Sequence, residues 1–355
     1  MPEGTRQSTF RPYAMRFEPQ LQTRVWGGRS LENLGKALPS EQPYGESWEI
    51  SDVEGKSSRV AAGAYEGWSL TQLLELFPSE VLGHPIGAFP LLFKLLDAQE
   101  NLSVQVHPAD EDLERTGATR TNPLLRGKTE AWVILDAQPG AEVLHGLAPG
   151  VDRADVVRRL QELDGSALSV EEVRSLFRWV EVEPGDVVFV PAGTIHALGE
   201  GIVLLEVQQT SDITYRLYDW GRLGLDGKPR RLHLTKSLDV VEPGPIRCPW
   251  TRFGPQAEKP GIRSLVDSDK FHVELVELNA ERAVETTTLA GNDHQFHILA
   301  GLEDVTEYRS AAGVDALSLS RGEFALLPAV LGGYSLVSRG DNGRCLRVSC
   351  PKGSL

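Results

Sequence analysis

The stretch GDVVFVPAGTIH, residues 185–196, decides the fold class of this 355-residue chain. Its β-branched run 186–190 favours a strand, and the Pro-Ala-Gly that follows favours a turn. The turn leads directly to His196. A lone histidine is more often a satisfied core or surface residue than a ligand, so neighbouring sequence must decide its role.

The stretch LSVQVHP (102–108) alternates strictly between polar and apolar residues. In a strand this puts Ser103, Gln105 and His107 on one face. For this stretch alone, an ordinary strand with a solvated polar face is the alternative.

The stretch GKTEAWVIL (127–135) has the same alternation. Lys128, Glu130 and Trp132 share one face, whereas Ala131 and Val133 face the other way. A single barrel interior would collect the polar residues of both stretches and His196.

Most of the chain is predicted to form short strands, such as AWVIL (131–135), DVVFV (186–190) and GIVLLEV (201–207), closed by Pro and Gly turns. Helical patterns are confined to 69–77, where Ser69 can cap the helix, to 151–179 and to 234–241. The chain is therefore expected to be mainly β, with a few helices on the outside.

A proline cluster indicates a domain boundary. Pro243, Pro245, Pro249, Pro255 and Pro260 disfavour regular structure and favour an extended connector. We expect an N-terminal domain over 1–244 that carries the metal site, a proline-rich linker over 245–260, and a C-terminal domain over 261–355.

A weak internal repeat straddles this boundary. The second copy, GEFALLPAVLGGY (322–334), repeats a glycine, five residues and Pro-Ala, but has no histidine at its end. Chance recurrence of a strand and a proline turn is the alternative. If the repeat is a duplication, the C-terminal domain is a degenerate copy without metal ligands.

Composition limits the class of partner. The formal net charge is −14, which disfavours nucleic acid or an anionic membrane as the main partner, so a phosphorylated substrate would need a local basic pocket. The three cysteines are too few for a disulfide framework or a cysteine-ligated zinc site, and reduced thiols are expected. No apolar run approaches the roughly 18 residues that span a bilayer, and no signal peptide is evident, so a cytoplasmic protein is expected. The sequence does not determine the oligomeric state.

The spacing of residues 185–196 matches the second motif of the cupins along its whole length. Cupins are antiparallel jelly-roll barrels that hold one metal ion with histidines and a glutamate. His107, Glu130 and His196 fit those roles, and Gln105 is a fourth candidate. These ligands suit one Zn²⁺ per chain, although Mn²⁺, Co²⁺ or Fe²⁺ could also bind.

Longer blocks resemble the type I mannose-6-phosphate isomerases, especially the shorter bacterial form. They are WGG (26–28), GESWEIS (45–51), FPLLFKLLDAQENLSVQVHP (89–108), GKTEAW (127–132), VPAGTIHALGEGIVLLEVQQTSDITYRLYDWGR (190–222) and LHLTKSLDVV (232–241). The resemblance implies zinc ligation by Gln105, His107, Glu130 and His196. It also implies a zinc-dependent interconversion of mannose 6-phosphate and fructose 6-phosphate.

The same resemblance implicates Lys94, Ser103, Lys128, Glu206 and Arg216. We expect Lys94, Ser103 and Lys128 to bind the sugar phosphate. Arg216, Glu206 and Lys128 are expected to assist proton transfer between C1 and C2, and the base is left open between Glu206, Lys128 and a water on the metal. The alternatives are a solvated surface role for Lys94 and a Glu206–Arg216 ion pair that only braces the loop 210–216.

Other functions remain as alternatives. One is a different cupin activity, such as glucose 6-phosphate isomerisation or oxygen chemistry, and the other is a non-catalytic sugar-binding cupin. This site has fewer histidines than oxygenase sites usually have, and a binding module would not need a full ligand set beside Lys128, Glu206 and Arg216. His272, His294 and His297 lack a carboxylate at motif spacing and are assigned structural roles.

Overall fold

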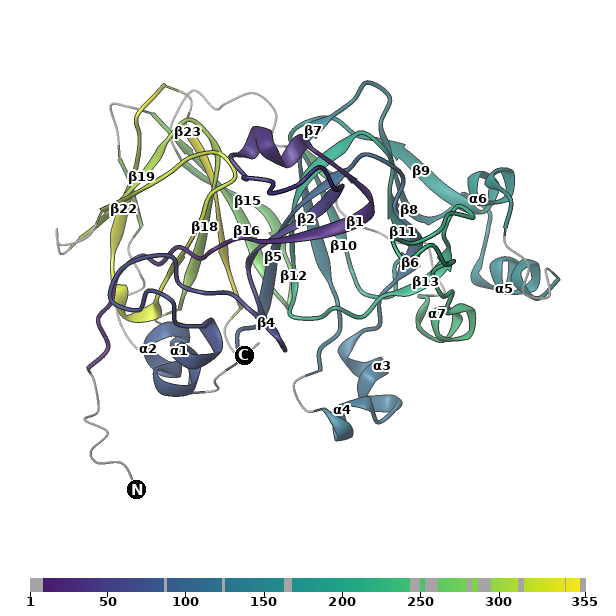
Figure 1. The fold of residues 1–355 in the computed structure, drawn as a ribbon, viewed down its shortest axis with the longest axis horizontal. Coiled ribbons are helices and arrows are strands. Elements are labelled where there is room, and N and C mark those ends of the chain that lie inside the picture. The colour runs from purple at the N-terminus through teal and green to yellow at the C-terminus, as the bar shows by residue number, and fades with distance from the viewer. Residues whose placement is uncertain are drawn as a thin grey trace. The chain divides into compact units, whose positions relative to one another are not determined.

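The computed structural model describes residues 9–85, 88–122, 125–162, 168–242, 250–252, 261–279, 283–286, 295–311, 316–341 and 343–351. Contacts group the described residues into two compact units (Figure 1). The metal-site unit comprises Pro19–Lys56 and Pro90–Pro255, and the second unit comprises the described parts of Met1–Glu18, Ser57–Phe89 and Gln256–Leu355. No helix in the described part of the chain is long and apolar enough to cross a membrane.

The metal-site unit is built from two antiparallel sheets. The seven-stranded sheet has the order β1 (Gln20–Gly28), β2 (Tyr44–Ile50), β5 (Leu91–Ala98), β12 (Ile202–Gln209), β7 (Glu130–Ala137), β10 (Asp186–Val190) and β14 (Trp250–Arg252). The five-stranded sheet has the order β13 (Tyr215–Tyr218), β6 (Val104–Val106), β11 (His196–Leu198), β8 (Glu142–Leu147) and β9 (Phe177–Glu181). A short ladder of β3 (Asp52–Val53) and β4 (Lys56–Ser57) ends the first segment of this unit. The predicted strands at 131–135, 186–190 and 201–207 are confirmed.

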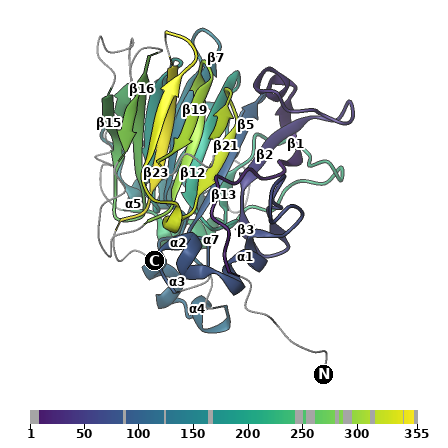
Figure 2. The ribbon, with the colours of Figure 1, turned by 90° about the vertical axis from the view of Figure 1, so that its left-hand side faces the viewer.

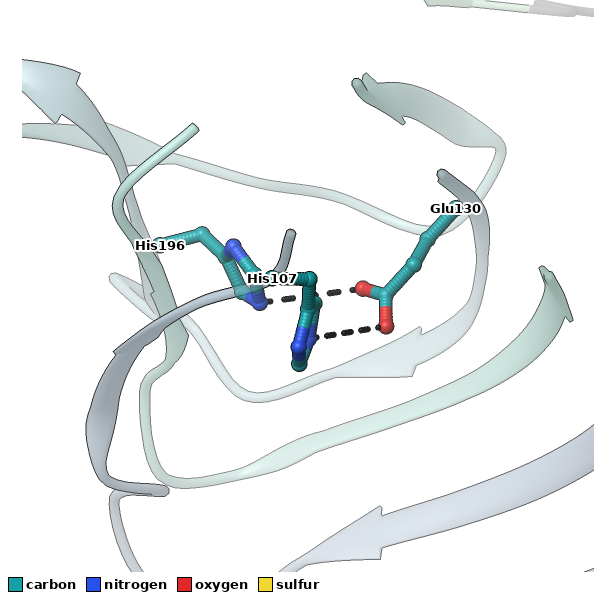
Figure 3. Close-up of side chains that lie close together, drawn as sticks. All are labelled: His107, Glu130 and His196. Atoms are coloured by element: carbon teal, nitrogen blue, oxygen red, sulfur yellow. Dashed lines mark ion pairs between the residues drawn. The ribbon is translucent and has the colours of Figure 1, made fainter. Parts of the chain in front are cut away.

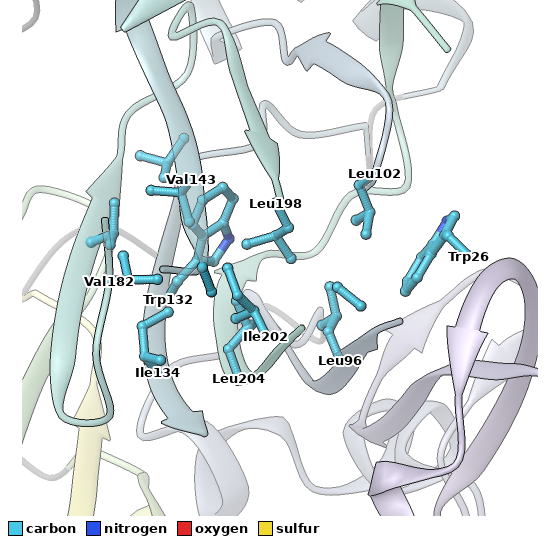
Figure 4. Packing of buried hydrophobic residues seen from close by; sticks show 14 residues of the cluster. Trp26, Leu96, Leu102, Trp132, Ile134, Val143, Val182, Leu198, Ile202 and Leu204 are labelled. Atoms are coloured by element: carbon cyan, nitrogen blue, oxygen red, sulfur yellow. The ribbon is translucent and has the colours of Figure 1, made fainter. Parts of the chain in front are cut away.

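Both sheets contribute to one apolar core, shown in Figure 4. On β12 the side chains of Ile202 and Leu204 lie in this core, and Glu206 is two residues further along the same face. On β7, Ile134 and Trp132 belong to the core and Glu130 follows on the same face. The interior therefore changes from apolar to polar along neighbouring strands, which concentrates the polar residues at one part of the barrel.

Helices cover the other face of the five-stranded sheet. They include α5 (Arg153–Glu162), α6 (Val170–Leu176) and α7 (Leu234–Val240), which lies beside β13 (Figure 1). Val104 and Val106 of β6 pack against Val173 and Val240 of these helices, which turns Gln105 to the opposite face. The remaining helices of this unit are η1 (Ser30–Leu34), α3 (Asp110–Arg115) and α4 (Ala118–Thr121).

The predicted helical pattern over 151–179 is wrong at its end. The helix α6 ends at Leu176, and Phe177–Glu181 forms β9 in antiparallel pairing with β8. Phe177 is buried in the cluster between sheet and helices, so tertiary packing extends the chain where local sequence favoured a helix.

The second unit also has two antiparallel sheets. One has the order β15 (Gly261–Asp267), β16 (His272–Leu278), β23 (Gly343–Ser349), β18 (His297–Glu303) and β21 (Phe324–Leu327). The other has the order β17 (Val284–Thr286), β22 (Tyr334–Ser338), β19 (Thr306–Ser310) and β20 (Ala316–Leu319). Figure 2 shows β15, β16 and β23 side by side. Both sheets bury residues in a shared core, so the prediction of antiparallel barrels is confirmed for this unit too.

Short helices complete the second unit: α1 (Leu70–Leu76), α2 (Pro78–Leu82) and η2 (Ala329–Leu331). The predicted cap is confirmed, because Ser69 accepts a hydrogen bond from Gln72 N and the Gln72 side chain accepts one from Ser69 N. Residues 9–18 and 57–85 join this unit, although the sequence suggested only residues beyond 260. Most of the predicted linker, 245–249 and 253–260, lies outside the described residues, and the predicted domain boundary stays a prediction.

Both copies of the predicted repeat run from a strand through a proline-containing connection into a second strand. In the first, β10 is followed by a proline turn and by β11, which begins at His196. In the second, β21 is followed by Pro328 and η2 and by β22, which begins at Tyr334. A tyrosine therefore begins the strand that a histidine begins in the metal-site unit.

Candidate active site

His107 follows β6 and points its ring toward Glu130. Its Nδ1 lies 2.7 Å from the Ile213 carbonyl oxygen. Because a carbonyl can only accept, Nδ1 carries the proton and the lone pair is at Nε2. That Nε2 lies 3.2 Å from Glu130 Oε1.

His196 is positioned in the same manner at the start of β11. Its Nδ1 lies 2.9 Å from the Thr194 carbonyl oxygen, so its lone pair is also at Nε2, 3.7 Å from Glu130 Oε2. The turn before it depends on Gly193, whose φ of +84° favours glycine. The turn and the carbonyl together fix the direction of the ring.

The three side chains converge, as Figure 3 shows. The candidate ligand atoms of His107, Glu130 and His196 lie within 4.8 Å of one another, and all three residues are buried. Burial lowers the pKa of His107 well below its usual range and lowers that of His196 to about 3, so both rings are neutral at pH 7. Neutral imidazoles with fixed Nε2 lone pairs beside a carboxylate fit a divalent metal.

Gln105 lies beside this triad. It pairs across the sheet with His196, and its Nε2 lies 3.3 Å from His196 Nε2. Ser103 Oγ donates to Gln105 Oε1 over 3.2 Å. An amide nitrogen cannot bind a cation, so Gln105 must turn its amide to offer the oxygen.

Lys128 and Trp132, two residues before and two after Glu130, both contact the Glu130 carboxylate. The Lys128 ammonium contacts Glu130 and lies 3.1 Å from His107 Nε2. Trp132 Nε1 donates to Glu130 Oε2 and to Glu206 Oε1, each over 3.2 Å. Burial lowers the pKa of Lys128 to about 8, further assisted by the Lys94 charge and opposed by the charge of Glu206.

A cavity of about 630 Å³ opens beside these residues. Its wall includes six cationic side chains, Arg24, Lys56, Lys94, Lys128, Arg216 and Arg230. Its four anionic side chains are Glu46, Glu206, Asp212 and Asp226. Cationic side chains therefore outnumber anionic ones in this wall, although the net charge of the chain is −14.

Lys94 and Glu206 form a buried ion pair in the cavity wall, with 3.2 Å between Nζ and Oε2. Lys94 is only 4% exposed, so the alternative of a solvated surface lysine is wrong. Burial by itself would lower the pKa of Lys94, but the Glu206 and Glu46 charges raise it above its usual value.

Arg216 lies on β13 opposite Gln105 and also lines the cavity. Within the described part of the chain its guanidinium has no carboxylate at ion-pair distance, and its buried Nε has no hydrogen-bond partner. Burial lowers its pKa, and the charge of Arg230 lowers it further. The alternative of a Glu206–Arg216 ion pair is not formed, because Glu206 pairs with Lys94.

Arg24 and Glu46 form an ion pair in the wall and were not among the predicted site residues. Arg24 donates to both Glu46 oxygens over 3.0 Å, and Trp48 Nε1 donates to Oε2 over 2.6 Å. Burial alone would raise the Glu46 pKa, but Lys94 and Arg24 lower it to about 2. Glu46 lies in the block 45–51, which was a signal for it, whereas Arg24 lies outside every block.

Two further ion pairs in this region were also missed. Lys56 pairs with Asp212 over 3.2 Å, and Arg230 pairs with Asp219. The first pair joins residues far apart in the sequence, and the second lies in an irregular loop. The alternation of polar and apolar residues predicts neither pair.

The other described histidines and cysteines do not join this triad. His272 pairs with Asp267 over 2.6 Å, and His297 Nδ1 lies 2.8 Å from Tyr334 Oη. Cys345 and Cys350 are buried free thiols. His294 and Cys248 lie outside the described residues. Over the described ranges, the triad is the one group of such side chains close enough to hold a metal.

The sequence is similar to proteins that are all described as mannose-6-phosphate (phosphomannose) isomerases. Residues 14–144 match the family model "Phosphomannose isomerase type I, catalytic domain". The mannose-6-phosphate isomerase ManA of Bacillus subtilis is 35% identical over 323 residues, covering 90% of this chain and 94% of the relative. A mannose-6-phosphate isomerase of Streptococcus mutans is 37% identical over 234 residues, covering 64% of this chain and 67% of that relative.

Solved structures with a similar fold cover almost the whole chain. The mannose 6-phosphate isomerase from Bacillus subtilis has a TM-score of 0.78 at 29% identity, covering 96% of this chain and 100% of that one. A mutant of the phosphomannose isomerase from Salmonella typhimurium has a TM-score of 0.73 at 20% identity, which shows the shared fold alone.

Proposed function

The chain belongs to the mannose-6-phosphate isomerases, and from this premise we propose that it is a zinc enzyme that interconverts mannose 6-phosphate and fructose 6-phosphate. One observation carries the proposal. A buried His107–Glu130–His196 triad with fixed Nε2 lone pairs lies beside a cavity with six cationic side chains. We propose the remaining roles from the side chains around this triad.

We assign the metal to Gln105, His107, Glu130 and His196. The two imidazoles are neutral and held by backbone carbonyls, which is the usual outer support of metal-binding histidines. Lys128 would give up its contacts to His107 and Glu130 once a metal is held there, leaving its amino group to the cavity. Zinc would supply Lewis-acid polarisation of the sugar oxygens when bound.

We assign substrate binding to Lys94, Ser103 and Lys128. All three line the cavity and all are buried. Lysine ammonium groups and a hydroxyl match the oxygens of a sugar phosphate. Lys94 is already neutralised by Glu206, so we expect its contribution to be hydrogen bonding within an overall basic wall rather than an isolated charge.

We assign proton transfer to Glu206, Lys128 and Arg216. Isomerisation moves a proton between C2 and C1 through an enediol-like intermediate, and negative charge develops on the sugar oxygens. Arg216 can stabilise that charge because, among the described residues, no carboxylate lies at ion-pair distance from its guanidinium. Glu206 is our first candidate for the base, and Lys128, with a pKa of about 8, is the second.

The decisive assay supplies mannose 6-phosphate to the purified protein and follows fructose 6-phosphate, with and without a chelator. We expect turnover that the chelator abolishes and added Zn²⁺ restores. Turnover that survives complete metal removal would contradict the zinc role, and glucose 6-phosphate as a preferred substrate would favour another sugar-phosphate isomerase.

Isomerisation in heavy water tests the proton-transfer route. We expect solvent deuterium at C1 of fructose 6-phosphate or C2 of mannose 6-phosphate, because a carboxylate base exchanges its proton during the lifetime of the intermediate. Product without deuterium would instead favour hydride transfer or a base shielded from solvent. A cytoplasmic location and the absence of nucleic-acid and membrane partners stay predictions.

A further inference from the structure

Three chain segments carry the triad, and their relative position is not fixed by a sheet alone. His107 is followed by the turn into α3, Glu130 begins β7, and His196 begins β11 after the turn 191–195. Glu130 lies on the seven-stranded sheet, His196 lies on the five-stranded sheet, and His107 lies one residue beyond the end of β6. Something beyond the ladders must therefore hold these segments together.

Asp110 and Gln209 join two of these segments by side-chain hydrogen bonds. Gln209 Nε2 donates to Asp110 Oδ2 over 3.0 Å, and Gln209 Oε1 accepts from Thr129 N over 3.0 Å. Asp110 Oδ1 accepts from Gly127 N over 2.6 Å. Gln209 is 7% exposed, so these bonds form where water competes little.

Thr129 extends the connection to the third segment. Its Oγ1 accepts from Ala192 N over 3.2 Å, and Gly193 N donates to the His107 carbonyl oxygen over 2.8 Å. All three segments are thus linked within four residues of a candidate ligand. We call Asp110, Gln209 and Thr129 the brace.

Gly127 shows how closely the braced segments approach. A Cβ built on Gly127 would lie 2.6 Å from Asp110 N and 2.8 Å from the Ala109 carbonyl carbon, which are rigid backbone atoms. Lys128 N also donates to the Pro108 carbonyl oxygen over 3.0 Å. The brace therefore joins segments whose backbones are already in contact. We expect that loss of a hydrogen bond of Asp110 or Gln209 shifts the backbone that carries His107 and Glu130.

We propose that Asp110 and Gln209 are positioning residues that set the metal affinity of the triad by holding the segments of His107 and Glu130 in register. The inference rests on the proposed metal site. Neither residue belongs to the triad or lines the cavity, so they act through the ligands rather than on the substrate. Outer partners of this kind typically change metal affinity about 10- to 100-fold.

The hydrogen-bond pattern permits a sharp test. In Gln209→Glu a carboxylate oxygen faces Asp110 Oδ2, and in Asp110→Asn two amide groups compete as donors, so each single variant breaks one bond. In the double variant Asp110→Asn/Gln209→Glu, the new amide donates to the new carboxylate. Gly127 N and Thr129 N then keep their acceptors.

The measurement is the Kd for Zn²⁺, by competition with a chromophoric chelator, on the metal-free full chain of each variant. We expect each single variant to bind about 10- to 100-fold more weakly and the double variant to return within about threefold of the original protein. Unfolding of the metal-free proteins is measured beside it. If Gln209→Glu does not fold, Gln209→Met removes both bonds without adding a charge.

Asp186 provides the matched control. It is buried on β10, accepts from Glu183 N over 2.8 Å and pairs with Arg252, but it is not joined to the triad. We expect Asp186→Asn to lower stability and leave the zinc Kd unchanged. Single variants with the original Kd, or a double variant no better than the singles, would overturn the brace. An original protein that binds no zinc would instead overturn the proposed metal site.

Discussion

At the scale of single residues, two buried histidines offer a direct comparison. His196 and His145 are paired across β11 and β8, but His145 Nε2 lies 3.0 Å from the Phe189 carbonyl oxygen and is not in the triad. His196→Ala should lower zinc from about one to below about 0.1 per chain, because it removes a coordinating nitrogen. Elemental analysis checks this, and His145→Ala should keep its metal. Full occupancy in His196→Ala would refute the assignment.

Arg216 is the cation for which we expect the largest catalytic effect. Arg216→Lys keeps the charge but loses the planar fork, and turnover should fall about 10²- to 10³-fold with zinc content preserved. Arg222, which pairs with Asp219 over 3.0 Å and is not among the cavity-lining residues, gives the control. Steady-state kinetics decide between the two, and normal turnover in Arg216→Lys would remove the electrostatic role.

The lowered pKa of Glu46 makes the folding stability of the protein depend on pH in the acidic range. Its pKa is about 2 in the folded chain and 4.5 for an ordinary glutamate, so the folded state holds fewer protons between these values. The resulting stabilisation is present above pH 4.5 and is lost as the pH falls toward 2. It amounts to about 3 kcal/mol at pH 7 and about half of that near pH 3.

Urea unfolding of the original protein and of Glu46→Gln at pH 7, 5 and 3.5 checks this prediction. The stability difference between them should shrink as the pH falls, because a protonated glutamate resembles the amide. A difference that is constant with pH would show that the ion pair with Arg24 contributes no net stability.

At the scale of elements, the turn between β10 and β11 is the most constrained. Gly193 has a φ of +84°, and a Cβ there would lie 2.7 Å from Glu242 Cγ and 3.1 Å from the Val240 carbonyl oxygen. Gly193→Ala should therefore cost about 2–4 kcal/mol from backbone strain and crowding together. Because His196 follows this turn, zinc affinity should fall as well.

Gly35 is a control that separates the cost of backbone strain from the cost of steric crowding. Its φ is +75°, but nothing lies within 4 Å of a Cβ built there. Gly35→Ala should cost only about 1–2 kcal/mol and leave the zinc Kd unchanged. Equal losses of stability in the two variants, measured by chemical denaturation, would show that the contacts around Gly193 relax without cost.

At the scale of the whole molecule, each unit has a core of its own. If zinc binds the folded metal-site unit as proposed, saturation at about 1,000 times Kd should stabilise that unit by about 4 kcal/mol. Amide exchange in β7 and β12 should slow on adding zinc, whereas exchange in β16 and β23 should not change. Equal slowing in both units, measured by mass spectrometry, would show that they unfold as one cooperative block.

The amino-acid sequence by itself determined the strand faces and singled out His107, Glu130 and His196, which the structure brings together. Alternation fixes which side chains share a face because successive residues of a strand point to opposite sides. Ser103, Gln105 and His107 could therefore be grouped before any partner strand was known, as could Lys128 and Glu130. The spacing in 185–196 placed His196 because a proline turn of fixed length leaves little freedom.

Only the tertiary structure decided which charges meet. The Lys94–Glu206 pair, the Arg24–Glu46 pair and the contact of Asp110 with Gln209 join residues that are far apart along the chain, and a local pattern carries no information on such distances. The same reason explains why Phe177 entered a strand and why residues 57–85 joined the C-terminal unit. The alternation of side chains within a strand follows from the local backbone and can be predicted from the sequence. Contacts between distant segments form only when folding brings those segments together.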